Sequence, residues 1–210
     1  CGIAWTKNKE KAYISDMPLG LIHVLDWKTK KEIKTITDEG MTFIHQIKMA
    51  PDGEHLWVTA PNEFGVQGPG KPNLGPRSQK PQIVIIDTKT DKVVEKIILP
   101  DHINLHDVEF SPDGKRLALS INAATSPSDV YVIELESGSL VRWTQSEVGG
   151  LDTSTFIEPT LVRFESFDGR SIPAFYYHPA GLKPGEKAPV LINIHGGPES
   201  QAQPTFNPSV

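Results

Sequence analysis

The residues with the clearest potential for chemistry lie near the C-terminus, where His195, Gly196, Gly197 and Pro198 directly follow the apolar run of residues 189–194. A buried strand that ends in histidine and two glycines lets the backbone turn sharply, because glycine carries no Cβ atom. The backbone N–H groups of such a turn can point at the oxygen that gains negative charge when an acyl carbon is attacked. These four residues are therefore candidates for an oxyanion-binding loop, which indicates acyl-transfer chemistry.

The nucleophile that this chemistry needs is missing from the sequence. A nucleophilic serine that follows a buried strand is typically found as Gly-x-Ser-x-Gly, and no such motif occurs in the 210 residues. Only fifteen residues follow His195, too few for a further strand and turn. We therefore expect a fragment of an enzyme, without catalytic activity by itself.

An internal repeat organises the first part of the chain. Residues 45–53 align with residues 106–114, which lie 61 positions later, and each copy alternates apolar and polar residues up to a Pro-Asp-Gly sequence. Strand-like runs follow each copy, so the Pro-Asp-Gly sequences that begin at Pro51 and Pro112 are predicted to be tight turns of β-hairpins. A plain hairpin turn is favoured here over a ligand-binding role.

Further strand-like runs complete the repeating unit. They cover residues 22–26, 32–36, 83–87, 93–99, 130–135 and 140–144. Four short strands joined by polar turns are the sequence form of a β-propeller blade, and the recurring turns resemble those of YVTN-type propellers. We predict a mainly β fold that opens with a partial β-propeller over residues 1–144, made of about three four-stranded blades, the first of them incomplete.

Two histidines occupy equivalent positions of the repeat, His45 and His106. Metal or haem ligation is conceivable for such a pair in a propeller. A residue that recurs in register usually serves the blade itself, however, and His23, His55 and His102 form no ligand-like cluster with them. We therefore expect a structural role for the two histidines, with no bound metal and no cofactor.

The pattern changes after the repeat. Alternation fades over residues 145–159, which we interpret as a linker, and strand-like runs restart at residues 161–166 and 172–178. A turn-rich stretch then leads to the apolar run of residues 189–194, predicted to be a buried third strand. This order is typical of the opening of an α/β-hydrolase domain. Residues 160–210 are thus predicted to be its truncated N-terminal part.

Several segments of the second half resemble the prolyl oligopeptidase family of serine peptidases, in the order in which that family carries them. They are residues 141–144, 146–150, 163–169, 172–175 and 190–201. The resemblance extends over about residues 105–210. It implies hydrolysis of short peptides by a Ser-Asp-His triad, which would lie beyond the C-terminus of this chain, beneath a propeller that filters access.

The resemblance also assigns roles within the loop. The backbone N–H of Gly197, with that of Gly196, would face the substrate oxygen, and Pro198 would stiffen the turn. His195 would brace the loop by hydrogen bonding, because the catalytic histidine of the family lies far downstream. These roles lead to our first hypothesis, a fragment of a serine peptidase that acts on peptides. The competing hypothesis is a non-catalytic YVTN-type propeller that binds or scaffolds a partner.

Composition limits the partners and the environment. The sequence has 21 Lys and Arg against 26 Asp and Glu, mixed along its length, and it lacks the basic stripe that nucleic-acid binding requires. No apolar stretch reaches the ~18 to 20 residues of a membrane span. The single cysteine, Cys1, excludes an internal disulfide, and it is also the first residue of a mature lipoprotein. Cytoplasmic and periplasmic locations are both compatible with the sequence.

The predicted number of blades has a consequence for assembly. A propeller ring usually needs ~4 to 8 blades, so about three blades leave strand edges open. We expect the chain to self-associate through these open edges.

Overall fold

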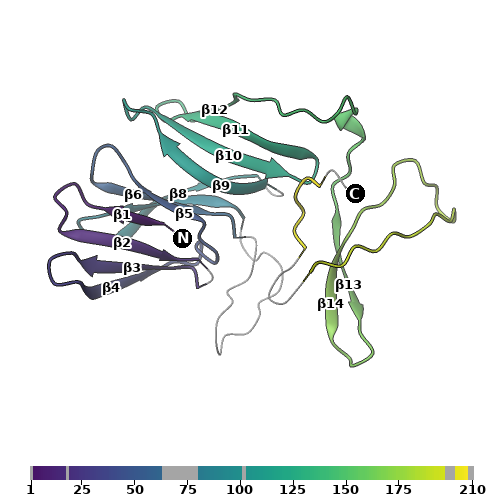
Figure 1. Cartoon of the computed structure of the whole chain (residues 1–210), viewed down its shortest axis with the longest axis horizontal. Helices are drawn as coiled ribbons and strands as arrows, with labels where there is room; N and C mark the ends of the chain where they lie inside the picture. The colour runs from purple at the N-terminus through teal and green to yellow at the C-terminus, as the bar shows by residue number, and fades with distance from the viewer. Residues whose placement is uncertain (1, 18, 63–79, 101–102, 197–201, 208–210) are drawn as a thin grey trace. The chain divides into compact units, whose positions relative to one another are not determined.

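The computed structural model describes residues 2–17, 19–62, 80–100, 103–196 and 202–207 (Figure 1). The chain divides into two compact units. The first comprises Cys1–Asn122 and Ser128–Gln145, and the second comprises Ala123–Pro127 and Ser146–Val210. The first unit ends one residue after the predicted end of the propeller portion.

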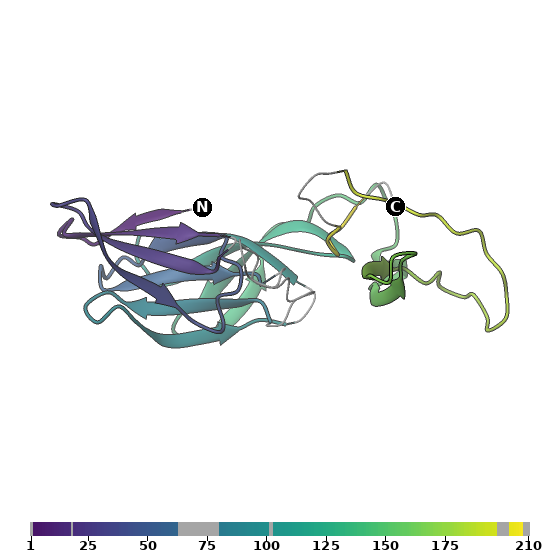
Figure 2. The same cartoon turned by 90° about the horizontal axis from the view of Figure 1, so that it is seen from below.

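The first unit consists of three four-stranded antiparallel sheets, each formed by four consecutive strands. The first sheet contains β1 (Ile3–Trp5), β2 (Lys11–Asp16), β3 (Leu21–Asp26) and β4 (Lys31–Thr37). The second contains β5 (Gln46–Met49), β6 (His55–Ala60), β7 (Gln82–Asp87) and β8 (Lys92–Ile98). The third contains β9 (Ile103–Phe110), β10 (Arg116–Ala123), β11 (Ser126–Glu134) and β12 (Ser139–Arg142). Figure 2 shows them in chain order, from purple through blue to teal.

This arrangement confirms the predicted fold class, a mainly β chain with partial propeller blades. The prediction that the first blade is incomplete was wrong, because β2 supplies its missing strand. The turn that joins β1 to β2 contains no glycine, and Lys9 adopts its left-handed conformation, with φ of 57°. A lysine is an unusual residue for that conformation, so this hairpin lacks the Asp-Gly sequence that marks the turns at Gly53 and Gly114.

Both Pro-Asp-Gly sequences form the predicted hairpin turns. Gly53 and Gly114 have φ values of 72° and 68°, a conformation that glycine adopts without steric cost. The N–H of Gly53 donates to the carbonyl of Ala50, and that of Gly114 donates to the carbonyl of Ser111, both at 2.9 Å. The two turns therefore repeat the same hydrogen-bonding pattern 61 residues apart.

The sheets bury their apolar faces against one another. Tyr13, Ile22 and Val24 of the first sheet form one core cluster with residues such as Leu56 and Val84 of the second. A further cluster joins the second and third sheets. It includes Ile83, Leu105, Leu117, Leu119 and Ile133. Sheet faces that pack together in this way are the basis of propeller blades.

A polar bridge also joins the first two blades. The buried hydroxyl of Tyr13 donates to a carboxylate oxygen of Asp91 at 2.7 Å, and Nζ of Lys11 lies 2.8 Å from the other oxygen. The Asp91 side chain is only 10% exposed. Burial, together with the hydrogen bond to Asp91, raises the pKa of Tyr13 far above its ordinary value.

The raised pKa of Tyr13 predicts a loss of stability in alkali. A tyrosine in the unfolded chain loses its proton above about pH 10, whereas Tyr13 retains it in the folded protein. The unfolded state then binds fewer protons, so the free energy of unfolding should fall by up to about 1.4 kcal/mol per pH unit. Urea unfolding at a series of alkaline pH values should show a shallower decline for Tyr13→Phe. Equal slopes in the two proteins would contradict this assignment.

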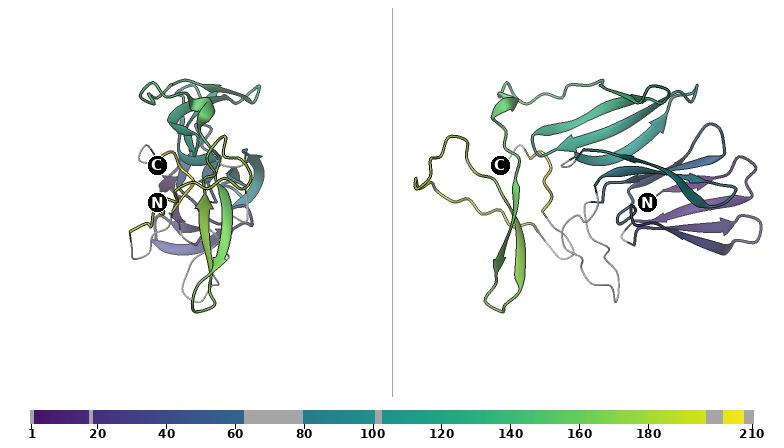
Figure 3. Two further views of the ribbon diagram at one scale, coloured as in Figure 1. Left: turned by 90° about the vertical axis from the view of Figure 1, so that its right-hand side faces the viewer. Right: turned by 180° about the vertical axis from the view of Figure 1, so that it is seen from behind.

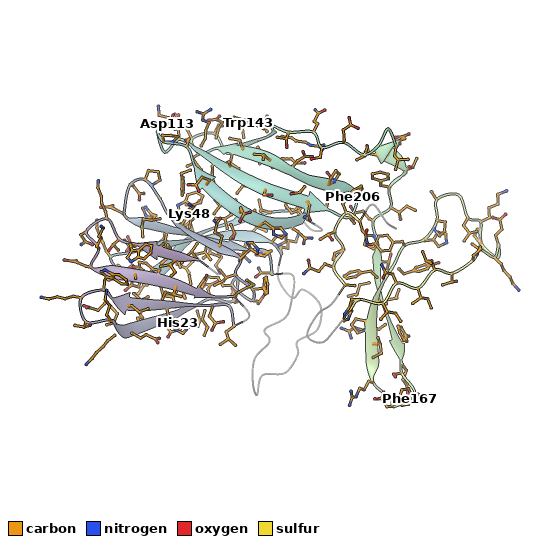
Figure 4. The ribbon with its side chains drawn as sticks, in the orientation of Figure 1. His23, Lys48, Asp113, Trp143, Phe167 and Phe206 are labelled. Carbon is orange, nitrogen blue, oxygen red and sulfur yellow. The ribbon has the colours of Figure 1, made fainter. Side chains whose placement is uncertain are left out.

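The second unit contains little regular structure. It includes a short 3-10 helix, η1 (Thr153–Thr155), and a hairpin of β13 (Thr160–Glu165) with β14 (Ser171–Tyr176). Phe167 lies fully exposed at the tip of the hairpin (Figure 4). The side chains of Phe156 and Phe206 lie together, with ring centroids 5.6 Å apart.

The predicted buried strand over residues 189–194 was wrong. These residues form no strand, and the side chains of the run are 77% to 83% exposed, among them Val190 and Ile192. A strand needs hydrogen-bonding neighbours, but β13 and β14 pair with each other, and no strand in the described ranges pairs with the run. Figure 3 shows the trace after β14 without a strand arrow. The described residues thus do not form an α/β-hydrolase opening.

Candidate functional site

The loop predicted to bind an oxyanion is only partly described, since Gly197 and Pro198 lie outside the described residues. His195 and Gly196 are exposed, and Nδ1 of His195 lies 2.8 Å from the carbonyl oxygen of Gly196. A Cβ atom at Gly196 would have no atom within 4 Å, so nothing packs against that position. The roles assigned to these four residues therefore stay predictions.

The equivalent histidines of the repeat lie side by side. The rings of His45 and His106 are 4.7 Å apart between centroids. Burial, followed by the proximity of His106, lowers the pKa of His45, which favours its neutral form. Within the described ranges, no group of three or more His, Cys, Asp or Glu side chains could hold a metal ion. His45 directly precedes β5 of the second blade and His106 lies on β9 of the third, so the pair forms a contact between two blades. The structural role expected for the two histidines stays a prediction.

An open pocket of about 370 Å³ lies between the second and third blades. Both Pro-Asp-Gly turns contribute to it, through Pro51 and Asp52 on one side and Asp113 on the other. Trp57 of β6 and Phe110 of β9 form its aromatic wall. Asp113 is labelled in Figure 4, at the turn between β9 and β10. We call this site the inter-blade pocket.

The aromatic wall is built by contact between the two blades. The rings of Trp57 and Phe110 meet edge to face, with centroids 5.3 Å apart and planes at 84°. Both side chains are half-buried. Because aromatic rings in this arrangement attract each other, the pair stabilises the blade interface and presents ring surface to the pocket.

Both carboxylates of the inter-blade pocket are held in their charged form. Burial opposes the charge on Asp52, but hydrogen bonds from the His55 ring and from backbone N–H groups keep the pKa of this carboxyl below its usual range. The hydroxyl of Ser111 and the backbone N–H of Lys115 lower the pKa of Asp113. No lysine or arginine lines the pocket as it is described. At neutral pH the pocket is therefore anionic.

A second pocket, of about 600 Å³, lies between the first and second blades. Its lining mixes charges of both signs, with Lys7, Lys11 and Lys89 beside Asp52 and Glu54. Lys89 and Glu54 already form an ion pair at 2.7 Å. The lining charges of this second pocket thus compensate one another, whereas the charged side chains that line the inter-blade pocket are both acidic.

The inter-blade pocket could not be read from the sequence. The Pro-Asp-Gly sequences form the predicted turns, but a turn pattern does not reveal which two turns come together. The aromatic residues Trp57 and Phe110 fit the alternation of buried strands equally well. Only the packing of two blades joins these residues in one site.

Comparisons with known proteins leave the family of the chain open. No family model matches the chain, and no curated protein matches it. Among solved structures, it is similar to the β-propeller domain of Cps50 (Swd1) from Myceliophteria thermophila, with 15% identity, 84% of this chain and 53% of that chain covered, and a TM-score of 0.49.

Two further solved structures have comparable scores. TolB from Acinetobacter baumannii has 18% identity, with 82% of this chain and 42% of that chain covered and a TM-score of 0.49. Hydrazine synthase from Kuenenia stuttgartiensis has 20% identity, with 70% of this chain and 55% of that chain covered and a TM-score of 0.40. The chain therefore spans about half the length of these structures. Such identities do not assign a function. Among the described residues, no helix has the length and apolar character of a membrane span.

Proposed function

We propose that this chain is a non-catalytic propeller-type binding module, and that its inter-blade pocket takes a lysine or arginine side chain of a partner peptide. The observation that carries the proposal is the lining of the pocket, which combines two ionised carboxylates with two aromatic rings. A cation gains from both kinds of group, by charge attraction and by contact with ring faces.

The size and lining of the pocket favour a long basic side chain over a bare metal ion. A volume of about 370 Å³ is much larger than one ion needs. Apolar surface from Pro51, Leu135 and the two rings lines the same space. The alkyl part of lysine or arginine packs well on such surface while its charged end reaches the carboxylates. The negative charge of the site also disfavours nucleic acid.

Calorimetric titration with two matched peptides tests the proposal. A short peptide with one central lysine should bind at least about tenfold more tightly than the same peptide with norleucine, which is a difference of about 1.4 kcal/mol. Rising salt concentration should narrow the difference, because it screens the attraction. Equal affinity for the two peptides would overturn the assigned ligand.

The matched variants are Asp113→Asn and Asp87→Asn. Asparagine at position 113 keeps the oxygen that accepts from Ser111 and Lys115 but removes a charge from the pocket. Asp87 makes a similar turn with Thr90 and does not line the pocket. Asp113→Asn should reduce the preference for lysine, because only the Asp52 carboxylate then remains in the pocket. Asp87→Asn should retain the full preference.

The peptidase hypothesis is a second proposal, supported by the ordered motif series from residue 141 to residue 201. In that case the chain would be part of a longer serine peptidase with its triad downstream. Sequence beyond Val210 decides between the two. A Gly-x-Ser-x-Gly motif followed by Asp and then His would support the peptidase, whereas a stop codon soon after Val210 would support the binding module.

A further inference from the structure

The inter-blade pocket and the second pocket adjoin each other. Asp52 lines both of them, and Gly53, the next residue of the turn between β5 and β6, lines the second. The turn is held in place, because the Asp52 carboxylate accepts hydrogen bonds from the N–H groups of Glu54 and His55. A peptide with its basic side chain in the inter-blade pocket can therefore continue across this turn to the second pocket.

Three lysines line the second pocket, and two of them already have a carboxylate partner. Lys89 pairs with Glu54 at 2.7 Å, and Lys11 pairs with Asp91 at 2.8 Å. Lys7 is exposed, and its side chain forms no hydrogen bond or ion pair with any residue that the structure describes. Lys7 is therefore the lining cation that is left to pair with an added anion.

The carboxylates that line the second pocket have partners as well. An oxygen of Asp52 lies 2.7 Å from Nδ1 of His55. The side-chain amide of Asn8 donates to a carboxylate oxygen of Glu10 at 2.7 Å. The remaining carboxylate is the one in the ion pair with a lysine described above. None of these three groups lies at ion-pair distance from Lys7, so none occupies its ammonium group.

The turn of the second blade positions the Lys7 side chain. A Cβ atom added at Gly53 would lie 3.1 Å from Cβ and 3.2 Å from Cδ of Lys7. The alkyl part of Lys7 thus packs over Gly53, where the missing side chain leaves room for it. The Lys7 side chain therefore lies beside the same turn that supplies the Asp52 carboxylate to the inter-blade pocket.

From this arrangement we infer that the partner peptide is bipartite, with a basic side chain in the inter-blade pocket and an acidic side chain a few residues away that pairs with Lys7. The inference rests on the proposed function, since it adds a second contact of the same peptide. A carboxylate fits here better than a phosphate, because the three carboxylates that line the second pocket repel a dianion more strongly.

Titration of the whole chain with a peptide series tests the inference. An extended peptide advances about 3.3 Å per residue, so each peptide carries a central lysine and one glutamate placed about two to five residues to either side. The matched peptide has glutamine at that position. Where the glutamate reaches Lys7, it should tighten binding about threefold to fivefold over glutamine, as expected for one exposed ion pair. At the other positions it should not tighten binding, because the inter-blade pocket is itself anionic.

Variants of Lys7 assign the gain to this side chain. Lys7→Gln should remove the advantage of glutamate over glutamine, and Lys7→Arg should retain it because the charge is kept. The matched control is Lys9→Gln, which removes the same charge from the same turn at a residue that does not line the second pocket. This control should leave the advantage of glutamate in place.

The outcomes separate this inference from the proposed function. If lysine peptides bind more tightly than norleucine peptides but glutamate gives no gain at any position, the bipartite ligand is wrong and the proposed function stands. A gain that Lys7→Gln leaves unchanged, or that Lys9→Gln removes to the same extent, would also overturn the inference. If none of the peptides binds, both proposals fail.

Discussion

Replacing Asp91 with alanine is expected to lower the free energy of unfolding by about 2–4 kcal/mol, since it removes one partner of a largely buried ion pair. The Asp91 carboxylate accepts from the ammonium group of Lys11 and from the hydroxyl of Tyr13. Both donors come from the first blade, whereas Asp91 belongs to the second. Its loss leaves the hydroxyl and the cation with only the backbone carbonyl of Thr88 as an acceptor.

Urea unfolding of matched variants measures this effect. The control is Glu54→Ala, which removes the ion pair between Glu54 and Lys89. The Glu54 side chain is 52% exposed and the Lys89 side chain is 70% exposed. That change should cost at most about 1 kcal/mol. Because Asp91 has a φ of 51°, Asp91→Asn is a second variant that suits this conformation. The free energy of unfolding of Asp91→Asn should lie between those of Asp91→Ala and the wild type. Equal losses for Asp91→Ala and Glu54→Ala would show that the bridge does not hold the blades together.

Gly20→Ala is expected to lower the free energy of unfolding by about 3–4 kcal/mol, because it combines backbone strain with a steric overlap. Gly20 lies in the turn between β2 and β3 with a φ of 61°, which a residue with a Cβ atom adopts only at a cost. An added Cβ would also overlap the carbonyl oxygen of Met41. That oxygen belongs to the backbone and has no side-chain freedom with which to move away.

Gly138→Ala isolates the conformational penalty. Gly138 has a φ of 69°, yet an added Cβ there would meet nothing within 4 Å. The free energy of unfolding of this variant should be only about 1–2 kcal/mol lower than that of the wild type. Thermal or urea unfolding of both variants gives the comparison. If the two glycines tolerate alanine equally, the close approach of Gly20 to Met41 is not present in solution.

The strands of the propeller portion could be predicted wherever alternation and turn chemistry agree. The Pro-Asp-Gly turns at Gly53 and Gly114 fix the hairpins of the second and third blades, because glycine suits their backbone conformation. β2 escaped prediction because its preceding turn uses Lys9 in the left-handed region. The turn contains Asn8 but no glycine, so it lacks the Asp-Gly sequence that identified the other two hairpins.

The run of residues 189–194 shows a different limit. An apolar run indicates that a segment would be buried if a sheet were present beside it. Whether neighbouring strands exist is a property of the whole fold, and the described part of the second unit provides only the self-paired hairpin of β13 and β14. Composition alone could not supply that information.

The inter-blade pocket could not be predicted for a related reason. Asp52 and Asp113 are 61 positions apart, and each is fully explained by its own turn. They line one pocket only because two blades stack and bring both carboxylates to one space with Trp57 and Phe110. The sequence repeat indicates that the two turns have the same conformation. Only the packing of the two blades brings the turns close together.

One measurement tests most directly whether the chain binds peptides without cleaving them. A fluorescent peptide with a central lysine is incubated with the whole chain, and the bound fraction is read by anisotropy while mass spectrometry follows the peptide. We predict saturable binding that Asp113→Asn weakens, with the peptide recovered intact. Cleavage of the peptide, or no binding at all, would contradict the account.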